Sequence, residues 1–163
     1  MKSSFFNLCL ILLIPVSLYA QPGKNKFRIF ISDNHNIQNE AYYYTITNDS
    51  LVITGLSDYG KSNIDYLKRV LTESESISMA DFMMKFPVDK FYPLYFKDYA
   101  NLGYISPEHF PRVIELELMN LGKSKKIKVN NSYVTQFAKL FEAINSLLPD
   151  EVKIKYEAKD LGK

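Results

Sequence analysis

Apolar and polar residues alternate along several short segments, and this pattern constrains the fold more than any other feature of the sequence. A strand places successive side chains on opposite faces, so a period of two marks a strand with one buried and one solvated face. The alternating segments are 26–33, 42–46, 51–53, 114–118, 126–129 and 151–157. Strands with one wet face are typical of antiparallel sheets. We therefore expect a mostly antiparallel sheet of about five to six strands.

The link between the second and third segments predicts a hairpin. If Asn48 and Asp49 form a two-residue turn, Ile46 lies opposite Leu51. Asn and Asp tolerate the positive φ angles that such a turn requires. Turn chemistry and apolar register agree, which favours the hairpin.

A second hairpin is expected between segments 114–118 and 126–129. A turn centred on Gly122-Lys123 would place Leu118 opposite Ile127. It would also place Glu117 opposite Lys128, which gives an ion pair on the solvated face. That pairing accounts for Glu115 and Glu117 better than acid–base catalysis does.

Helical spacing of apolar residues occurs in three places. The segments are 64–71, 79–86 and 134–148. Ser62 is a candidate cap for the first helix and Ser78 for the second, and Pro149 ends the third. Two or three helices on the apolar face of an antiparallel sheet define an α+β fold.

Aromatic residues are concentrated in the connection between Phe86 and Pro111. The chain has twelve Tyr, eleven Phe and no Trp. Tyr92, Tyr95 and Tyr99 step by three and four, so a short helix would place them on one side. A surface row of tyrosines is typical of protein, peptide or glycan contact, and packing against the core is the alternative.

The N-terminus has the composition of a secretory signal. Lys2 precedes an uncharged run from Phe5 to Leu18, and Ala20 suits the position before a cleavage site. The run is too short to span a bilayer as a helix. Cys9, the single cysteine, lies inside this run and not after it, which argues against lipid anchoring. We expect a cleaved signal peptide at 1–20, one domain at 21–163, and a periplasmic or secreted protein without a membrane span.

Composition narrows the class of the mature protein. About 143 residues are enough for one domain with a sizeable core. No cysteine remains after cleavage, which excludes disulfides and thiol catalysis and favours a bacterial envelope setting. Positive and negative charges are interspersed with a net charge of +2, so nucleic acid is not an expected partner.

Residues 55–62 match the phosphate-binding loop pattern G-x-x-x-x-G-K-[ST]. In that interpretation the backbone at Gly55 and Gly60 wraps phosphates, Lys61 reaches the outer phosphates and Ser62 holds Mg²⁺. However, such a loop follows a strand of a parallel sheet, and an exported protein meets little nucleoside triphosphate. The favoured interpretation is a strand-to-helix turn with Ser62 as helix cap.

Other catalytic or metal-binding patterns are weaker. His35, in the predicted loop between Asp33 and Glu40, and His109 have no second ligand at metal-site spacing. No nucleophile signature is present in the sequence. We therefore expect no catalytic residue, metal or cofactor.

The last fifty or so residues carry one resemblance. The strings K-V-N-N-S-Y-V-T-Q-F, A-I-N-S-L-L-P and V-K-I-K-Y resemble the ends of small exported proteins of unknown function from Bacteroidota-type bacteria. The resemblance implies an envelope setting and no activity. The hypothesis from sequence is a non-enzymatic binding or accessory protein that contacts a partner through Tyr92, Tyr95 and Tyr99. The alternatives are a nucleotide-binding protein and an inhibitor or immunity-type partner.

Overall fold

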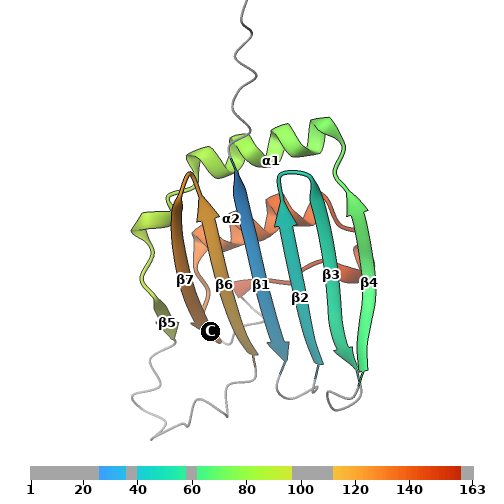
Figure 1. Cartoon of the computed structure of the whole chain (residues 1–163). Helices are drawn as coiled ribbons and strands as arrows, with labels where there is room; N and C mark the ends of the chain where they lie inside the picture. The colour runs from blue at the N-terminus through green and yellow to red at the C-terminus, as the bar shows by residue number, and fades with distance from the viewer. Residues whose placement is uncertain (1–25, 36–39, 58–61, 97–111, 159–163) are drawn as a thin grey trace, which may run out of the picture.

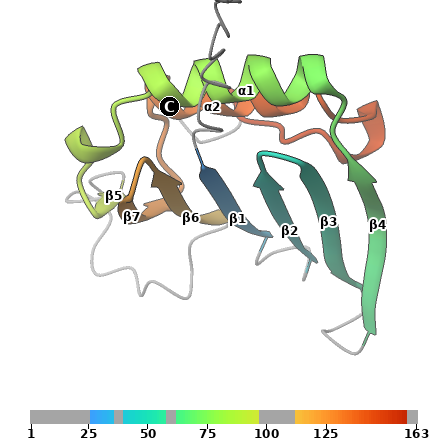
Figure 2. The same cartoon turned by 45° about the horizontal axis from the view of Figure 1, so that its top comes forward.

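A seven-stranded mixed sheet forms the centre of the structure, and two helices lie over one of its faces (Figures 1 and 2). The computed structural model describes residues 26–35, 40–57, 62–96 and 112–158. The elements are β1 (Phe27–His35), β2 (Glu40–Thr47), β3 (Ser50–Ser57), β4 (Ser62–Val70), α1 (Glu73–Lys85), the 3₁₀ turn η1 (Val88–Lys90), β5 (Leu94–Phe96), β6 (Arg112–Asn120), β7 (Lys123–Asn130), α2 (Thr135–Asn145) and the 3₁₀ turn η3 (Asp150–Val152). The predicted α+β class is confirmed, but the sheet is larger than the five to six strands expected.

The strand order is β4-β3-β2-β1-β6-β7-β5. Neighbouring strands are antiparallel except β5 and β7, which run parallel. The segment with α1 crosses from the β4 edge to the β5 edge, and Figure 1 looks onto the face that the helices leave uncovered. The predicted signal segment 1–20, together with Gly60, Lys61, Tyr99 and His109, lies outside the described residues.

The first predicted hairpin is confirmed. Residues 48 and 49 link β2 to β3, and Ile46 lies opposite Leu51. The Asn48 side chain has a second role, since its Oδ1 accepts a hydrogen bond from the Phe27 N–H at 2.9 Å. The turn therefore also holds the start of the central strand β1.

The second hairpin is present, but its predicted register is wrong by two residues. The turn consists of Leu121 and Gly122, with φ angles of 51° and 78°. This turn pairs Leu116 with Ile127, in place of the expected Leu118. A two-residue turn with two positive φ angles matches the twist of the strands better than a turn centred one residue later. A shift of two residues keeps each side chain on its expected face.

The corrected register also changes the charged pairs on the uncovered face. Glu117 lies opposite Lys126, with 3.7 Å between Oε2 and Nζ. Glu115 takes the expected place opposite Lys128, at 3.1 Å between Oε1 and Nζ. Both acids thus have lysine partners on the neighbouring strand, as the alternating pattern predicted.

The helix predicted at 64–71 is wrong, because these residues form most of β4. Strand β4 has a bulge at Tyr66, where the pairing passes from Asp65 to Leu67 while β3 advances by one residue. The extra residue puts Ile64 and Leu67 on the same face although they are three positions apart. A bulged strand therefore imitates the apolar spacing of a helix.

The predicted helix at 79–86 exists, but it begins earlier. Helix α1 starts at Glu73 and is capped by Thr72, not by Ser78. Thr72 and Glu75 form a capping box, in which each side chain bonds to the other residue's backbone N–H. Helix α2 matches its predicted apolar stripe and ends before Pro149.

The strand expected at 151–157 does not join the sheet. Val152, Ile154 and Tyr156 alternate with exposed residues and are buried as predicted. The Asn145 side chain satisfies the backbone of this segment: its Oδ1 accepts from the Ile154 N–H at 2.8 Å, and its Nδ2 donates to the Ile154 carbonyl at 2.9 Å. One amide side chain at the end of α2 thus takes the place of a neighbouring strand.

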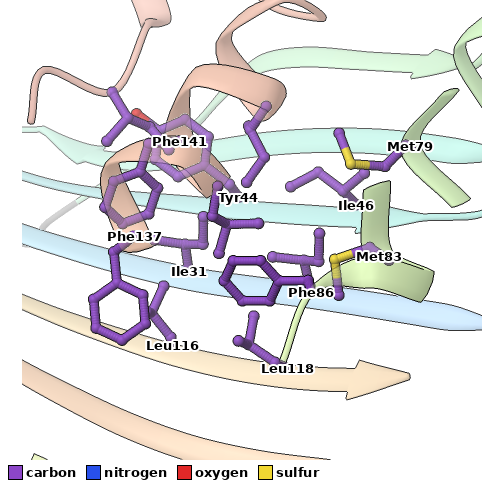
Figure 3. Close-up of a cluster of buried hydrophobic side chains, with 14 of the residues drawn as sticks. Ile31, Tyr44, Ile46, Met79, Met83, Phe86, Leu116, Leu118, Phe137 and Phe141 are labelled. Atoms are coloured by element: carbon purple, nitrogen blue, oxygen red, sulfur yellow. The ribbon is translucent and has the colours of Figure 1, made fainter. Parts of the chain in front are cut away.

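The core lies between the sheet and the two helices (Figure 3). Helix α2 contributes Phe137 and Phe141, and α1 contributes Met79 and Met83, all of them buried. They pack on the apolar face of the central strands, whose labelled members are Ile31, Tyr44, Ile46, Leu116 and Leu118.

Candidate functional site

The tyrosines singled out in the sequence lie at one edge of the sheet and not on a helix. Tyr95 is the middle residue of β5, and Tyr92 precedes this strand. The Tyr92 side chain is 71% exposed, whereas Tyr95 is partly buried against the core. The expected alignment on a short helix is therefore wrong for these two residues.

A chain of aromatic rings holds this segment against the core. The rings of Phe82, Phe86, Phe91, Phe137, Tyr95 and Tyr92 follow one another with centroid separations of 5.4, 5.2, 4.8, 5.4 and 6.1 Å. Stacked and edge-to-face pairs at such distances stabilise beyond the burial of their area. The series begins at α1, crosses α2 and ends at the surface. The packing interpretation thus holds for part of the aromatic connection.

Tyr95 anchors the strand from its centre. Its ring meets Phe137 edge-on at an interplanar angle of 88°, and its hydroxyl oxygen accepts a hydrogen bond from the Tyr92 N–H at 3.0 Å. Because side chains alternate along a strand, the neighbours of Tyr95 point to the opposite face. These neighbours, Leu94 and Phe96, are 47% and 57% exposed. We call Tyr92, Leu94, Tyr95 and Phe96 the aromatic edge.

The backbone of the aromatic edge also has groups that face outward. The Lys128 N–H donates to the Pro93 carbonyl at 2.9 Å, and Tyr95 pairs with Val129 in the parallel ladder. In a parallel ladder the backbone groups of every second residue bond to the same neighbouring strand, so those of Pro93 and Tyr95 point towards β7. The N–H and C=O groups of Leu94 and Phe96 point away from it. Strand β5 ends the strand order, and no other described strand pairs with that side.

The strand next to the aromatic edge is rich in lysine. Strand β7 contains four Lys and no acidic residue. Lys126 and Lys128 pair with glutamates of β6, and Lys123 pairs with Asp89. In the described part of the chain, Lys90 of η1 and Lys125 have no acidic partner. Among the described residues near β5, two lysines thus keep an uncompensated positive charge.

The phosphate-loop match lies between two antiparallel strands. Gly55 is within β3, and Ser62 begins β4, where it pairs with Ser57. A phosphate-binding loop leads into a helix whose first N–H groups bind the anion, but residues 62–70 are a strand. The strand-to-helix turn, expected in both interpretations, is therefore wrong, and Ser62 caps no helix. A Cβ at Gly55 would clash with Cε2 of Tyr66, so the glycine makes room for that ring.

Asp33 and Arg112 form a buried ion pair near the C-terminal end of β1. Arg112 donates from Nε to Asp33 Oδ1 at 2.8 Å and from Nη2 to Oδ2 at 2.6 Å, and its Nη1 donates to the Lys155 carbonyl. His35 is not in a loop as expected but ends β1, with Nε2 at 3.4 Å from Asp33 Oδ1. Burial raises the pKa of Asp33, but the hydrogen bonds from His35 and Arg112 and the arginine charge outweigh it and lower the pKa.

The geometry gives this cluster a structural role. Arg112 engages both oxygens of Asp33 and also binds the backbone at Lys155, so it ties the C-terminal segment to the sheet. In the same segment the Tyr156 hydroxyl donates to the Ser132 carbonyl at 2.8 Å and accepts from the Val134 N–H at 3.0 Å. Burial raises the pKa of Tyr156 to about 12, so its hydroxyl keeps the donated proton at neutral pH.

Among the described residues, no group of three His, Cys, Asp or Glu side chains is placed to hold a metal ion. The helices described are also too short or too polar to cross a membrane. No protein-family model and no curated protein matches the chain.

The sequence interpretation missed Leu94 and did not separate Phe96 from the other aromatics. The available signal was the short apolar run Leu94-Tyr95-Phe96 directly after Pro93, which is compatible with a short edge strand. The tyrosine spacing concealed this signal, because it also fits a helix.

Proposed function

We propose that the protein is a non-enzymatic binding or accessory protein of the bacterial envelope, exported through its N-terminal signal, and that it captures its partner with the aromatic edge. The observation that carries the proposal is the exposure of Tyr92, Leu94 and Phe96 on a segment that the ring chain holds in place. Aromatic side chains supply large contact area, and a surface held rigid before binding loses little entropy on association.

The test is site-specific photo-crosslinking. A photoreactive amino acid replaces Phe96 in the chain expressed in its native host, and the same amino acid replaces Val70 as the control. Val70 is 75% exposed and lies at the opposite edge of the sheet. We expect discrete adducts at position 96 that Leu94→Lys weakens, and no such adducts at position 70. Equal labelling at both positions would contradict the proposal.

Export is tested separately. N-terminal sequencing of the protein recovered from the envelope or the medium is expected to begin at Gln21, after cleavage at Ala20. A chain that retains Met1 in the cytoplasm would contradict the proposed setting without bearing on the aromatic edge.

A further inference from the structure

We propose that the aromatic edge binds an extended segment of another polypeptide, which adds to the sheet as a strand next to β5 and carries acidic residues. This inference rests on the proposed function and specifies the class of partner. Strand addition at a sheet edge is a recurrent mode of peptide recognition, in which backbone hydrogen bonds supply affinity and alternate side chains supply specificity.

The β5–β7 ladder leaves one side of the β5 backbone facing outward. Since the bond from Lys128 to Pro93 assigns alternate residues to β7, Leu94 and Phe96 present two N–H and two C=O groups outward. These groups have the spacing of a strand and no partner among the described residues. An extended peptide can bond to all four, whereas a glycan does not reproduce the alternation of donors and acceptors.

The same two residues also offer apolar side chains to a docking segment. Leu94 and Phe96 both project from the uncovered face and are among the exposed large apolar residues. A strand added beside β5 would place every second side chain next to them. The docking segment therefore has apolar residues at alternate positions.

Two lysines near β5 favour a docking segment with acidic flanks over a second copy of this chain. Lys90 and Lys125 lack acidic partners in the described part and lie towards the start of β5, so an acidic residue beyond the apolar stretch would face them. Strand β5 of another copy carries no acidic side chain that could pair with Lys90 or Lys125. An acidic segment is attracted to both lysines.

The probe is a fluorescent ten-residue peptide in which valine and threonine alternate and two glutamates occupy one end. Its matched control has two lysines in place of the glutamates. Fluorescence anisotropy with the full-length chain is expected to show saturable binding below about 1 mM for the acidic peptide, which corresponds to only about 4 kcal/mol. The lysine peptide is expected to bind the wild-type chain at least about fivefold more weakly. The acidic peptide is expected to bind the Lys90→Glu variant more weakly by the same factor. No saturable binding of the acidic peptide at 1 mM would overturn the proposal.

Backbone methylation separates strand addition from side-chain contact. Two versions of the acidic peptide carry N-methyl groups on alternate residues, one set on odd and one on even positions. Only one edge of the peptide bonds to β5, so one set is expected to weaken binding by about tenfold or more and the other by about twofold or less. Equal effects of the two sets would overturn strand addition, even if crosslinking at position 96 upholds the proposed function.

A substitution in the protein tests strand addition independently of any change in the peptide. Leu94→Pro removes one outward N–H but no β5–β7 hydrogen bond, and proline is tolerated on such an edge. Loss of one hydrogen bond is expected to weaken peptide binding about fivefold, and Val70→Pro at the opposite edge is the control. Unchanged binding to a folded Leu94→Pro chain would overturn the proposal, as would concentration-dependent dimerisation that Leu94→Lys abolishes.

Discussion

The two edges of the sheet are held and protected in different ways. Strand β4 has nine residues, a bulge, and charged side chains at Asp65 and Lys68 on the uncovered face. Strand β5 has three residues, no charge and no bulge. Bulges and charges on an edge strand hinder the addition of another chain. The long edge is therefore protected by a bulge and charges, whereas in the described part of the chain only its short length limits strand addition at β5.

The two edges also differ in what attaches them to the helices. At β4, Arg69 donates to both oxygens of Glu75 at 2.8 Å and to the Leu147 carbonyl at 2.9 Å. At β5, the attachment is the packing of Tyr95 and Phe91 on Phe137. Polar bonds hold one edge and aromatic packing holds the other, so the two edges should respond to different substitutions.

The largest effect is expected for Phe137→Ala. The ring is fully buried and contacts both Phe91 and Tyr95. We expect the free energy of unfolding to fall by about 3–5 kcal/mol, as for other buried Phe-to-Ala changes. Urea unfolding measures the loss. Hydrogen exchange at the Lys128 N–H, which bonds to Pro93, should accelerate more than exchange in the β3–β4 ladder. Uniform acceleration in both ladders would contradict separate attachment of the two edges.

A smaller effect is expected for Arg69→Met at the other edge. The change removes a bidentate pair with Glu75 and the bond to the Leu147 carbonyl, which together should contribute about 1–2 kcal/mol. Lys68→Met is the matched control, since its side chain is exposed and has no described acidic partner; its effect should stay below about 0.5 kcal/mol. Equal losses for the two variants would show that the arginine bonds do not stabilise this edge.

Acid should weaken the β4 attachment through Glu75. The hydrogen bond from Arg69, followed by the bond to the Thr72 backbone, lowers the pKa of Glu75 to about 2. The unfolded chain has the usual value of about 4.3, so the stabilisation is complete above that pH and is lost as the pH falls towards 2.

Glu75→Gln isolates this contribution, because glutamine can still form the capping box with Thr72. The wild type should be more stable than the variant by about 1 kcal/mol at neutral pH, after allowance for solvent screening of this partly exposed pair. Urea unfolding from pH 7 to pH 2 should show the difference shrinking below pH 4.5. A constant difference across this range would argue against the lowered pKa.

The smallest effect is expected for Phe96→Ser. Its ring is more than half exposed and appears in none of the ring pairs of the described residues. Stability should change by less than about 0.5 kcal/mol, while crosslinking through a probe at position 94 should decline. A loss above 1 kcal/mol in urea unfolding would mean that Phe96 supports the fold and not a partner.

Part of the fold could be predicted because the spacing of apolar residues along the chain indicates which side of a strand or helix is buried. The alternation around Ile46 and Leu51 predicted a correct hairpin, and the stripe through Phe137 and Phe141 predicted α2. In β4 the spacing of apolar residues was misleading because of the bulge at Tyr66, since one extra residue converts a period of two into a spacing of three. For the candidate site, the aromatic segment could be located, but its exposed residues could not.

The sequence by itself determined which segments have one apolar face, because that property depends only on residue order and backbone period. Tertiary structure decided which segments pair. The stretch through Ile154 alternates like a strand, yet it lies outside the sheet and the backbone of Ile154 bonds to the Asn145 side chain. Tertiary structure also decided which face of β5 is buried: Tyr95 packs on Phe137, and alternation then leaves Leu94 and Phe96 exposed, with outward backbone groups that no described residue pairs. That orientation depends on the ring of Phe137, 42 residues further along the chain than Tyr95, so the local sequence of β5 does not determine it.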